Sequence, residues 1–160
     1  MASTNNALDI VTAGLPLYDG VGGWTALPYA NTTWTPALKF NATTGITYTT
    51  QVGLYTRIGN VIFISMNIVL SSKGSSTGFA AFTGLPFSAS ATNVLYMLNA
   101  EYLGMAGFPP STDIPIGLIQ ASSNQILPFA YGSGVGTISQ LGDSFFTNTS
   151  TIRFNGFYRI

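Results

Sequence analysis

The amino-acid sequence predicts an all-β protein, an antiparallel β-sandwich of jelly-roll type with about eight to ten strands and an extended N-terminal arm. From Trp34 onward, β-branched and aromatic runs are separated by Gly, Asn, Ser and Pro clusters about every 8 to 12 residues, which is typical of sandwiches and barrels. Windows longer than about eight residues with helical periodicity are all interrupted by Gly, Pro or dense β-branching. We therefore expect strands throughout and no long helix.

We expect residues 1–33 to form the arm and residues 34–160 to form the sandwich domain. Gly and Pro recur along the first 33 residues, so this segment can hold only short extended pieces. It also carries the aromatic side chains of Tyr18, Trp24 and Tyr29 shortly before Trp34. These rings have three interpretations: they hold the arm against its own sandwich, they anchor a protein partner, or they stack on a glycan.

The clearest strand is Val61–Leu70, in which every second residue is apolar while Ser65 and Asn67 lie on the other face. This alternation predicts that one face belongs entirely to the core. The preceding segment Leu54–Ile58 is joined to it by Gly59-Asn60, a two-residue link of the type that forms tight hairpin turns. The sequence therefore predicts a β-hairpin here.

A second long strand is expected at Asn93–Met105, where both faces carry apolar side chains. We expect one face to lie in the core and the other to contact another subunit. Glu101 stands within this apolar strand, and a carboxylate there is costly to bury unless it is paired. Its candidate partners, within or across subunits, are Arg57, Arg153 and Arg159.

The remaining strands are shorter. They are expected at Trp34–Phe40, Ile46–Thr50, Phe79–Thr83, Ile114–Ala121, Gln125–Tyr131, Ser144–Phe146 and Thr151–Ile160. The last contains Asn155-Gly156, which would normally indicate a hairpin. Because only four residues follow, a bulged terminal strand is expected instead.

Charged residues make up only 6% of the chain, against about 25% in an ordinary soluble domain. The five Lys and Arg residues are balanced by five Asp and Glu residues, so the chain has no basic excess to attract a phosphate backbone. We therefore do not expect it to bind nucleic acid. The longest apolar run, Val61–Leu70, is far shorter than the roughly 20 residues of a membrane-spanning helix, so no membrane insertion is expected. Since subunit interfaces are depleted in charge, we expect the protein to be an oligomer.

The inventory of reactive groups argues against an enzyme. The chain contains no Cys and no His, which excludes thiol nucleophiles, imidazole bases and the usual zinc sites. Gly132–Gly136 lacks the Lys-Ser/Thr of a phosphate loop and is interpreted as a flexible loop. We therefore predict no catalytic residue, no cofactor and no metal; the spacing of the acids indicates no catalytic pair among Asp9, Asp19, Glu101, Asp113 and Asp143.

Several segments resemble a module that recurs in virion proteins of tailed bacteriophages, at the ends of tail fibres and as small free-standing structural proteins. They are Trp34-Thr35-Pro36, Thr44–Tyr48, Gly53–Val61, Leu70–Gly74, Gly84–Phe87 and the closing Asn155–Ile160. The resemblance implies a non-enzymatic β-sandwich homotrimer held together by apolar subunit interfaces. It places the protein on the virion surface.

Two functions are compatible with this resemblance. A fibre tip normally follows a long shaft, whereas only a short arm precedes the sandwich here, so we expect a capsid decoration (cement) protein that clamps neighbouring major capsid subunits. The residues expected to contact the shell are Leu8, Ile10, Leu15, Tyr18, Trp24 and Tyr29. The alternative is a receptor-binding tip that attaches to a tail protein and contacts a host-surface glycan or protein through loops near Gly74–Gly78 or Gly132–Gly136.

Overall fold

A computed structural model describes residues 15–18, 24–92, 94–107, 114–131 and 138–160. This part of the chain contains twelve strands and one short 3-10 helix, η1 (Asp143–Phe145). The strands are β1 (Leu15–Tyr18), β2 (Trp24–Leu27), β3 (Tyr29–Trp34), β4 (Ala37–Phe40), β5 (Ile46–Ile58), β6 (Val61–Lys73), β7 (Ala80–Thr83), β8 (Tyr96–Leu103), β9 (Ile114–Ile119), β10 (Leu127–Tyr131), β11 (Ile138–Gln140) and β12 (Thr151–Arg159). The predicted all-β class is confirmed.

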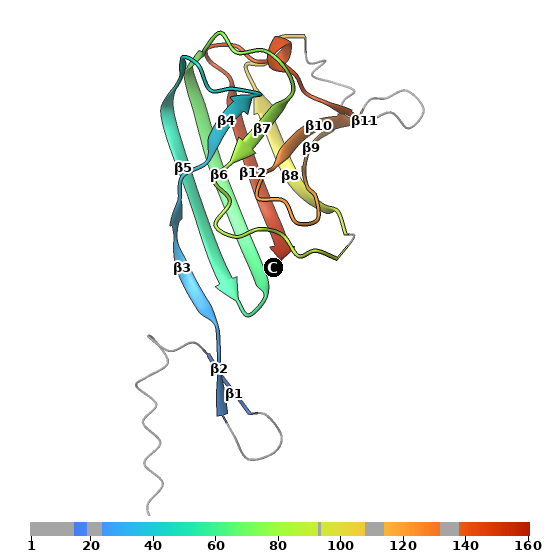
Figure 1. Cartoon of the computed structure of the whole chain (residues 1–160). Coiled ribbons are helices and arrows are strands. Elements are labelled where there is room, and N and C mark those ends of the chain that lie inside the picture. Colours follow the sequence, from blue (N-terminus) through green and yellow to red (C-terminus); the bar gives the residue numbers. More distant parts are fainter. Residues whose placement is uncertain (1–14, 19–23, 93, 108–113, 132–137) are drawn as a thin grey trace, which may run out of the picture.

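The strands form a sandwich of two unequal layers. Eight of them make one antiparallel sheet in the order β11-β10-β9-β8-β12-β6-β5-β3, while β4 and β7 pair separately and lie in front of it (Figure 1). Phe82 on β7 exchanges backbone hydrogen bonds with Ile126 next to β10, so the small layer is tied to the far end of the large one. Between the layers lies a core of completely or almost completely buried side chains, including Phe40, Phe154 and Tyr158.

The predicted hairpin is confirmed in β5 and β6. Ile58 pairs with Val61 across the turn, and Gly59 adopts the positive φ of 60° that such turns favour. The residues at even positions from Ile62 to Leu70 are all buried, as their alternation predicts. The structure extends this hairpin, because Ile46–Thr50 is the beginning of β5 rather than a separate strand. Its register with β6 shifts near Tyr48.

Two predictions about the C-terminal third are wrong. Ser144–Phe146 is not a strand, since the chain forms η1 there. The terminal strand β12 has no bulge at Asn155-Gly156: it pairs with β6 in unbroken register along its whole length. The glycine has a packing role instead, because a Cβ on Gly156 would lie 2.7 Å from a methyl carbon of Leu98 on β8.

The N-terminal segment contains more structure than a simple extended arm. β1 and β2 form a hairpin that projects from the lower end of the sandwich in Figure 1, and β3 follows as the edge strand of the large sheet, paired with β5. Gly59 in the β5–β6 turn donates a backbone hydrogen bond to Pro28 between β2 and β3 (2.7 Å). The last residues of the expected arm, from Tyr29 to Thr33, thus belong to the main sheet.

Candidate interaction surface

The two faces of the large sheet have different surroundings. The inner face packs against β4, β7 and the connecting segments, whereas large apolar side chains on the outer face are exposed. We call this outer surface the open face; among its apolar members are Val52, Leu54, Ile58, Phe63, Met97, Leu103 and Phe157, all at least 36% exposed. Single exposed apolar residues are ordinary, but a contiguous set of them marks an interaction site.

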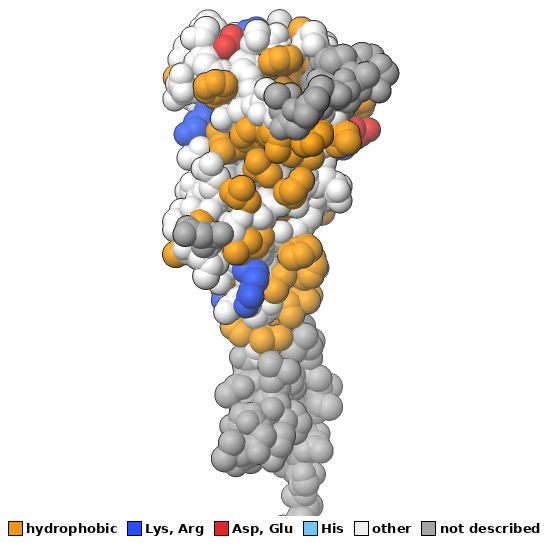
Figure 2. Space-filling view, turned by 90° about the vertical axis from the view of Figure 1, so that its right-hand side faces the viewer, with side chains coloured by type: hydrophobic (Ala, Val, Ile, Leu, Met, Phe, Trp, Pro, Cys, Tyr) orange, Lys and Arg blue, Asp and Glu red, His pale blue; other side chains and the backbone are white. Residues whose placement is uncertain are grey.

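Strand register places these side chains on the same face of the sheet, and two of them are direct neighbours. Phe63 on β6 lies directly opposite Phe157 on β12, with ring centroids 6.0 Å apart. Leu54 on β5 is opposite Ser65, and Met97 on β8 shares its face with Asn99, which is opposite Asn155. The side of the molecule that Figure 2 shows also carries many hydrophobic side chains, with few charged groups among them.

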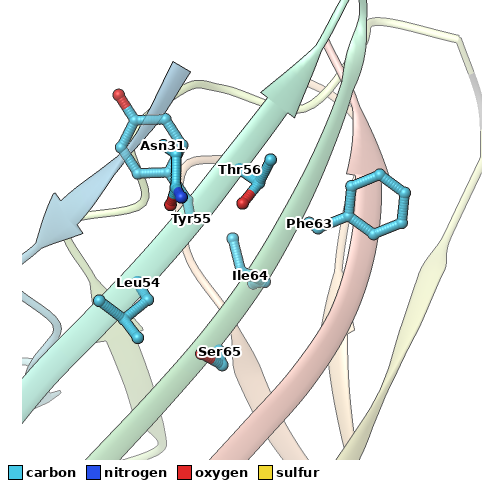
Figure 3. A pocket seen from close by; sticks show the side chains of 7 residues that line it. All are labelled: Asn31, Leu54, Tyr55, Thr56, Phe63, Ile64 and Ser65. Carbon is cyan, nitrogen blue, oxygen red and sulfur yellow. The ribbon is translucent and has the colours of Figure 1, made fainter. Parts of the chain in front are cut away.

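Shallow hollows flank Leu54 on the open face. One of about 280 Å³ is lined by residues of β3, β5 and β6; Leu54 and Phe63 lie apart there, with Thr56 and Ile64 between them (Figure 3). Another of about 210 Å³ continues along β5 and β6 and is lined by Val52, Leu54, Ser65, Met66 and Asn67. The surface therefore carries both projecting aromatic rings and recesses.

The polar groups of the open face pair with one another. Arg153 on β12 donates from Nη1 to Glu101 Oε2 (2.5 Å) and from Nε to Asn67 Oδ1 (3.3 Å). Asn99 Nδ2 donates to Asn155 Oδ1 (3.3 Å). An arginine partner for Glu101 was among the expectations from sequence, and Arg153 is that partner. The centre of the open face is consequently neutral.

A larger hollow of about 360 Å³ lies at the end of the sheet. Its lining residues are Asn60, Ser90, Thr92, Val94, Tyr96, Arg159 and Ile160. It lies beyond Asn155, where the pairing of β12 with β8 stops while the pairing of β12 with β6 continues. Its polar groups are hydroxyl, amide and guanidinium groups, which suit ligand binding better than acid–base chemistry.

The residues predicted to contact a shell are only partly described. Leu15, Tyr18 and Trp24 lie on the β1–β2 hairpin, where Tyr18 pairs with Trp24, while Leu8 and Ile10 lie outside the described residues. Tyr29 is 46% exposed on β3, opposite Ile58 of the open face.

Sequence reasoning missed the contribution of Phe63 and Phe157 to this surface. For Phe63 the signal was present, because it lies between the buried residues Ile62 and Ile64, as in a strand that is apolar on both faces. The signal was weaker for Phe157, because the preceding Gly156 has no side chain.

Asp143, like Glu101, is held by hydrogen bonds and an ion pair within the fold. Asp143 Oδ1 accepts a hydrogen bond from the Gly78 N–H (2.9 Å), and Asp143 Oδ2 lies 3.9 Å from Lys73 Nζ. Burial raises the pKa of Tyr158 to about 12 and that of Tyr102 further still.

Within the described ranges, no three His, Cys, Asp or Glu side chains gather in a group that could hold a metal ion. The same ranges contain no helix with the length and hydropathy to span a membrane.

No protein-family model matches the chain. Among solved structures, it is similar to part of the Dettilon tailspike protein, with a TM-score of 0.66 and 20% sequence identity. The matched region covers 82% of this chain but 24% of the tailspike chain, so the protein corresponds to about a quarter of that larger molecule. At this identity the similarity establishes a shared fold.

Proposed function

We propose that this chain is a structural protein of a bacteriophage virion and serves as a surface module of the tail. The observation that carries the proposal is the shared fold with a quarter of a tailspike chain. The phage-like segments between Trp34 and Phe87 support it independently, as does the open face, whose exposed apolar side chains and neutral centre suit a larger assembly.

The two ends of the sandwich suit a tail module. The β1–β2 hairpin projects from one end, and the loop that follows Lys73 lies at the other (Figure 1). In the proposed arrangement the hairpin end attaches to a tail protein, and the opposite end faces a host-surface glycan or protein. The loop is anchored from both sides: Gly78 bonds to Asp143, and the backbone N–H of Lys73 donates to Asn148 Oδ1 (2.9 Å).

A capsid decoration protein is the second candidate. The projecting hairpin favours it, because a hairpin standing away from its own domain can lie on a neighbouring shell subunit. The proposal then assigns the shell contact to the arm residues named above. Replacing Trp24 and Tyr29 together by Ala should release the protein from capsids, while a folded variant that still decorates them would contradict this candidate.

Labelling of purified virions with an antibody to this chain, followed by electron microscopy, separates the two candidates. Label on the tail in few copies supports the tail module, and label over the whole head supports decoration. Virions without label on either part would contradict the virion assignment.

The proposal also includes a non-enzymatic role. Its test is host-polysaccharide depolymerisation by the purified protein. An activity that disappears in Glu101→Gln or Asp143→Asn would contradict this part of the proposal.

A further inference from the structure

We propose that the open face is the surface through which copies of this chain associate with one another. The inference concerns this chain alone and stands whether the protein is found on the head or the tail of a virion.

The apolar area of the open face matches that of a protein interface. Six of its side chains, Val52, Leu54, Ile58, Phe63, Met97 and Phe157, are between 36% and 65% exposed. At about 200 Å² for a large apolar side chain, they present roughly 600 Å², the upper end for the largest patch of an ordinary monomer. A standard interface buries about 800 Å² per partner, a little over half of it apolar. The open face supplies that apolar share.

The shape of this surface fits an interface with anchor residues. Phe157 is 56% exposed and stands beside Phe63, while the hollows of about 280 and 210 Å³ lie on both sides of Leu54. Projecting aromatic side chains that enter recesses on the partner supply most of the binding energy in protein interfaces. Because both features occur on one surface, two copies can each offer a ring and a recess.

The polar groups between the apolar ones favour a second copy as the occupant. Asn67, Asn99 and Asn155 carry amides that both donate and accept hydrogen bonds, so identical faces can satisfy one another. Arg153 and Glu101 are paired within the face, and a second copy brings the same two charges. Each of these amides has more hydrogen-bonding capacity than its bond within the face uses, and a lipid surface offers no partner for the rest. Lipid surfaces are also attracted by basic patches, whereas this chain has no net charge.

Sedimentation equilibrium of the full chain at several concentrations tests the inference, with Phe157→Glu as the variant and Phe79→Glu as its matched control. Phe79 is 64% exposed but precedes β7 in the other layer. We expect the unaltered protein to associate into a defined oligomer. Phe157→Glu should weaken association at least about 30-fold, or about 2 kcal/mol at 1.4 kcal/mol per tenfold, while Phe79→Glu should leave it unchanged.

Circular dichroism establishes that each variant is folded. If Phe157→Glu does not fold, Leu54→Lys takes its place, since Leu54 is half-exposed in the middle of the same face. An unaltered protein that stays monomeric would overturn the inference, as would equal weakening by the two glutamate variants or full association of the folded Phe157→Glu protein. Attachment of a monomeric protein to virions or vesicles through the open face would assign that face to another partner. None of these results depends on where antibody labels the virion.

Discussion

The hydroxyl of Tyr158 gives the sharpest test of how the core is held together. Tyr158 is completely buried on β12 and donates a hydrogen bond to the backbone oxygen of Phe87 (2.9 Å), in the segment that follows β7. Its ring lies edge-on to that of Tyr96, with centroids 6.4 Å apart. Tyr158→Phe keeps the ring and removes only the hydroxyl, so the oxygen of Phe87 loses this partner. We expect the free energy of unfolding at neutral pH to fall by about 1–2 kcal/mol.

The same substitution should change the dependence of stability on alkaline pH. Burial raises the pKa of Tyr158 in the folded protein to about 12, against about 10 in an unfolded chain. Below pH of about 10 both states hold the proton; between about 10 and 12 the unfolded state loses it first, and the free energy of unfolding falls. The Phe variant lacks this group, so its stability should fall less over that interval. Tyr102, whose pKa burial also raises, is present in both proteins.

Urea unfolding followed by far-ultraviolet circular dichroism, at neutral pH and at intervals above pH of about 10, measures both effects. Tyr131→Phe is the control, because Tyr131 is 41% exposed, and its stability change should stay within about 0.5 kcal/mol. Equal stability of Tyr158→Phe and the unaltered protein at neutral pH would refute the role of the hydrogen bond. A stability difference that does not narrow from pH of about 10 toward 12 would refute the reasoning about the pKa.

Three further substitutions test other parts of the structure. A Cβ on Gly117 would lie 2.8 Å from ring carbons of Phe154, so Gly117→Ala should destabilise the protein by about 1–3 kcal/mol in urea unfolding; Gly142→Ala, with its nearest contact at 3.5 Å, should be tolerated. Ile68→Ala, at a completely buried position, should cost about 2–5 kcal/mol in the same assay, and a smaller loss would contradict its place in the core. Arg153→Gln breaks an exposed ion pair, so the free energy of unfolding should fall by less than about 1 kcal/mol. In the variant, this free energy should depend little on salt concentration.

Local patterns in the sequence predicted the parts of the fold that depend on neighbouring residues. The Gly59-Asn60 turn and the alternation from Val61 to Leu70 sufficed for the central hairpin, because a two-residue turn determines the register of both strands. The predicted bulge at Asn155-Gly156 is absent, because this sequence, which is typical of turns, lies within an unbroken strand. The glycine there makes room for Leu98, which belongs to a distant segment of the chain, and no local pattern contains that information.

For the open face, too, some features follow from the sequence and others only from the tertiary structure. The sequence alone determined that the protein has few charges, that it folds into strands, and that the strand expected at Asn93–Met105 is apolar on both faces, because composition and a period of two are local properties. Only the tertiary structure decided that β12 lies between β6 and β8, which brings Phe157 beside Phe63 and Arg153 beside Glu101. Alternation determines which side of a strand is apolar, but the neighbour of each strand follows from packing summed over the whole sheet. The open face is a product of that packing.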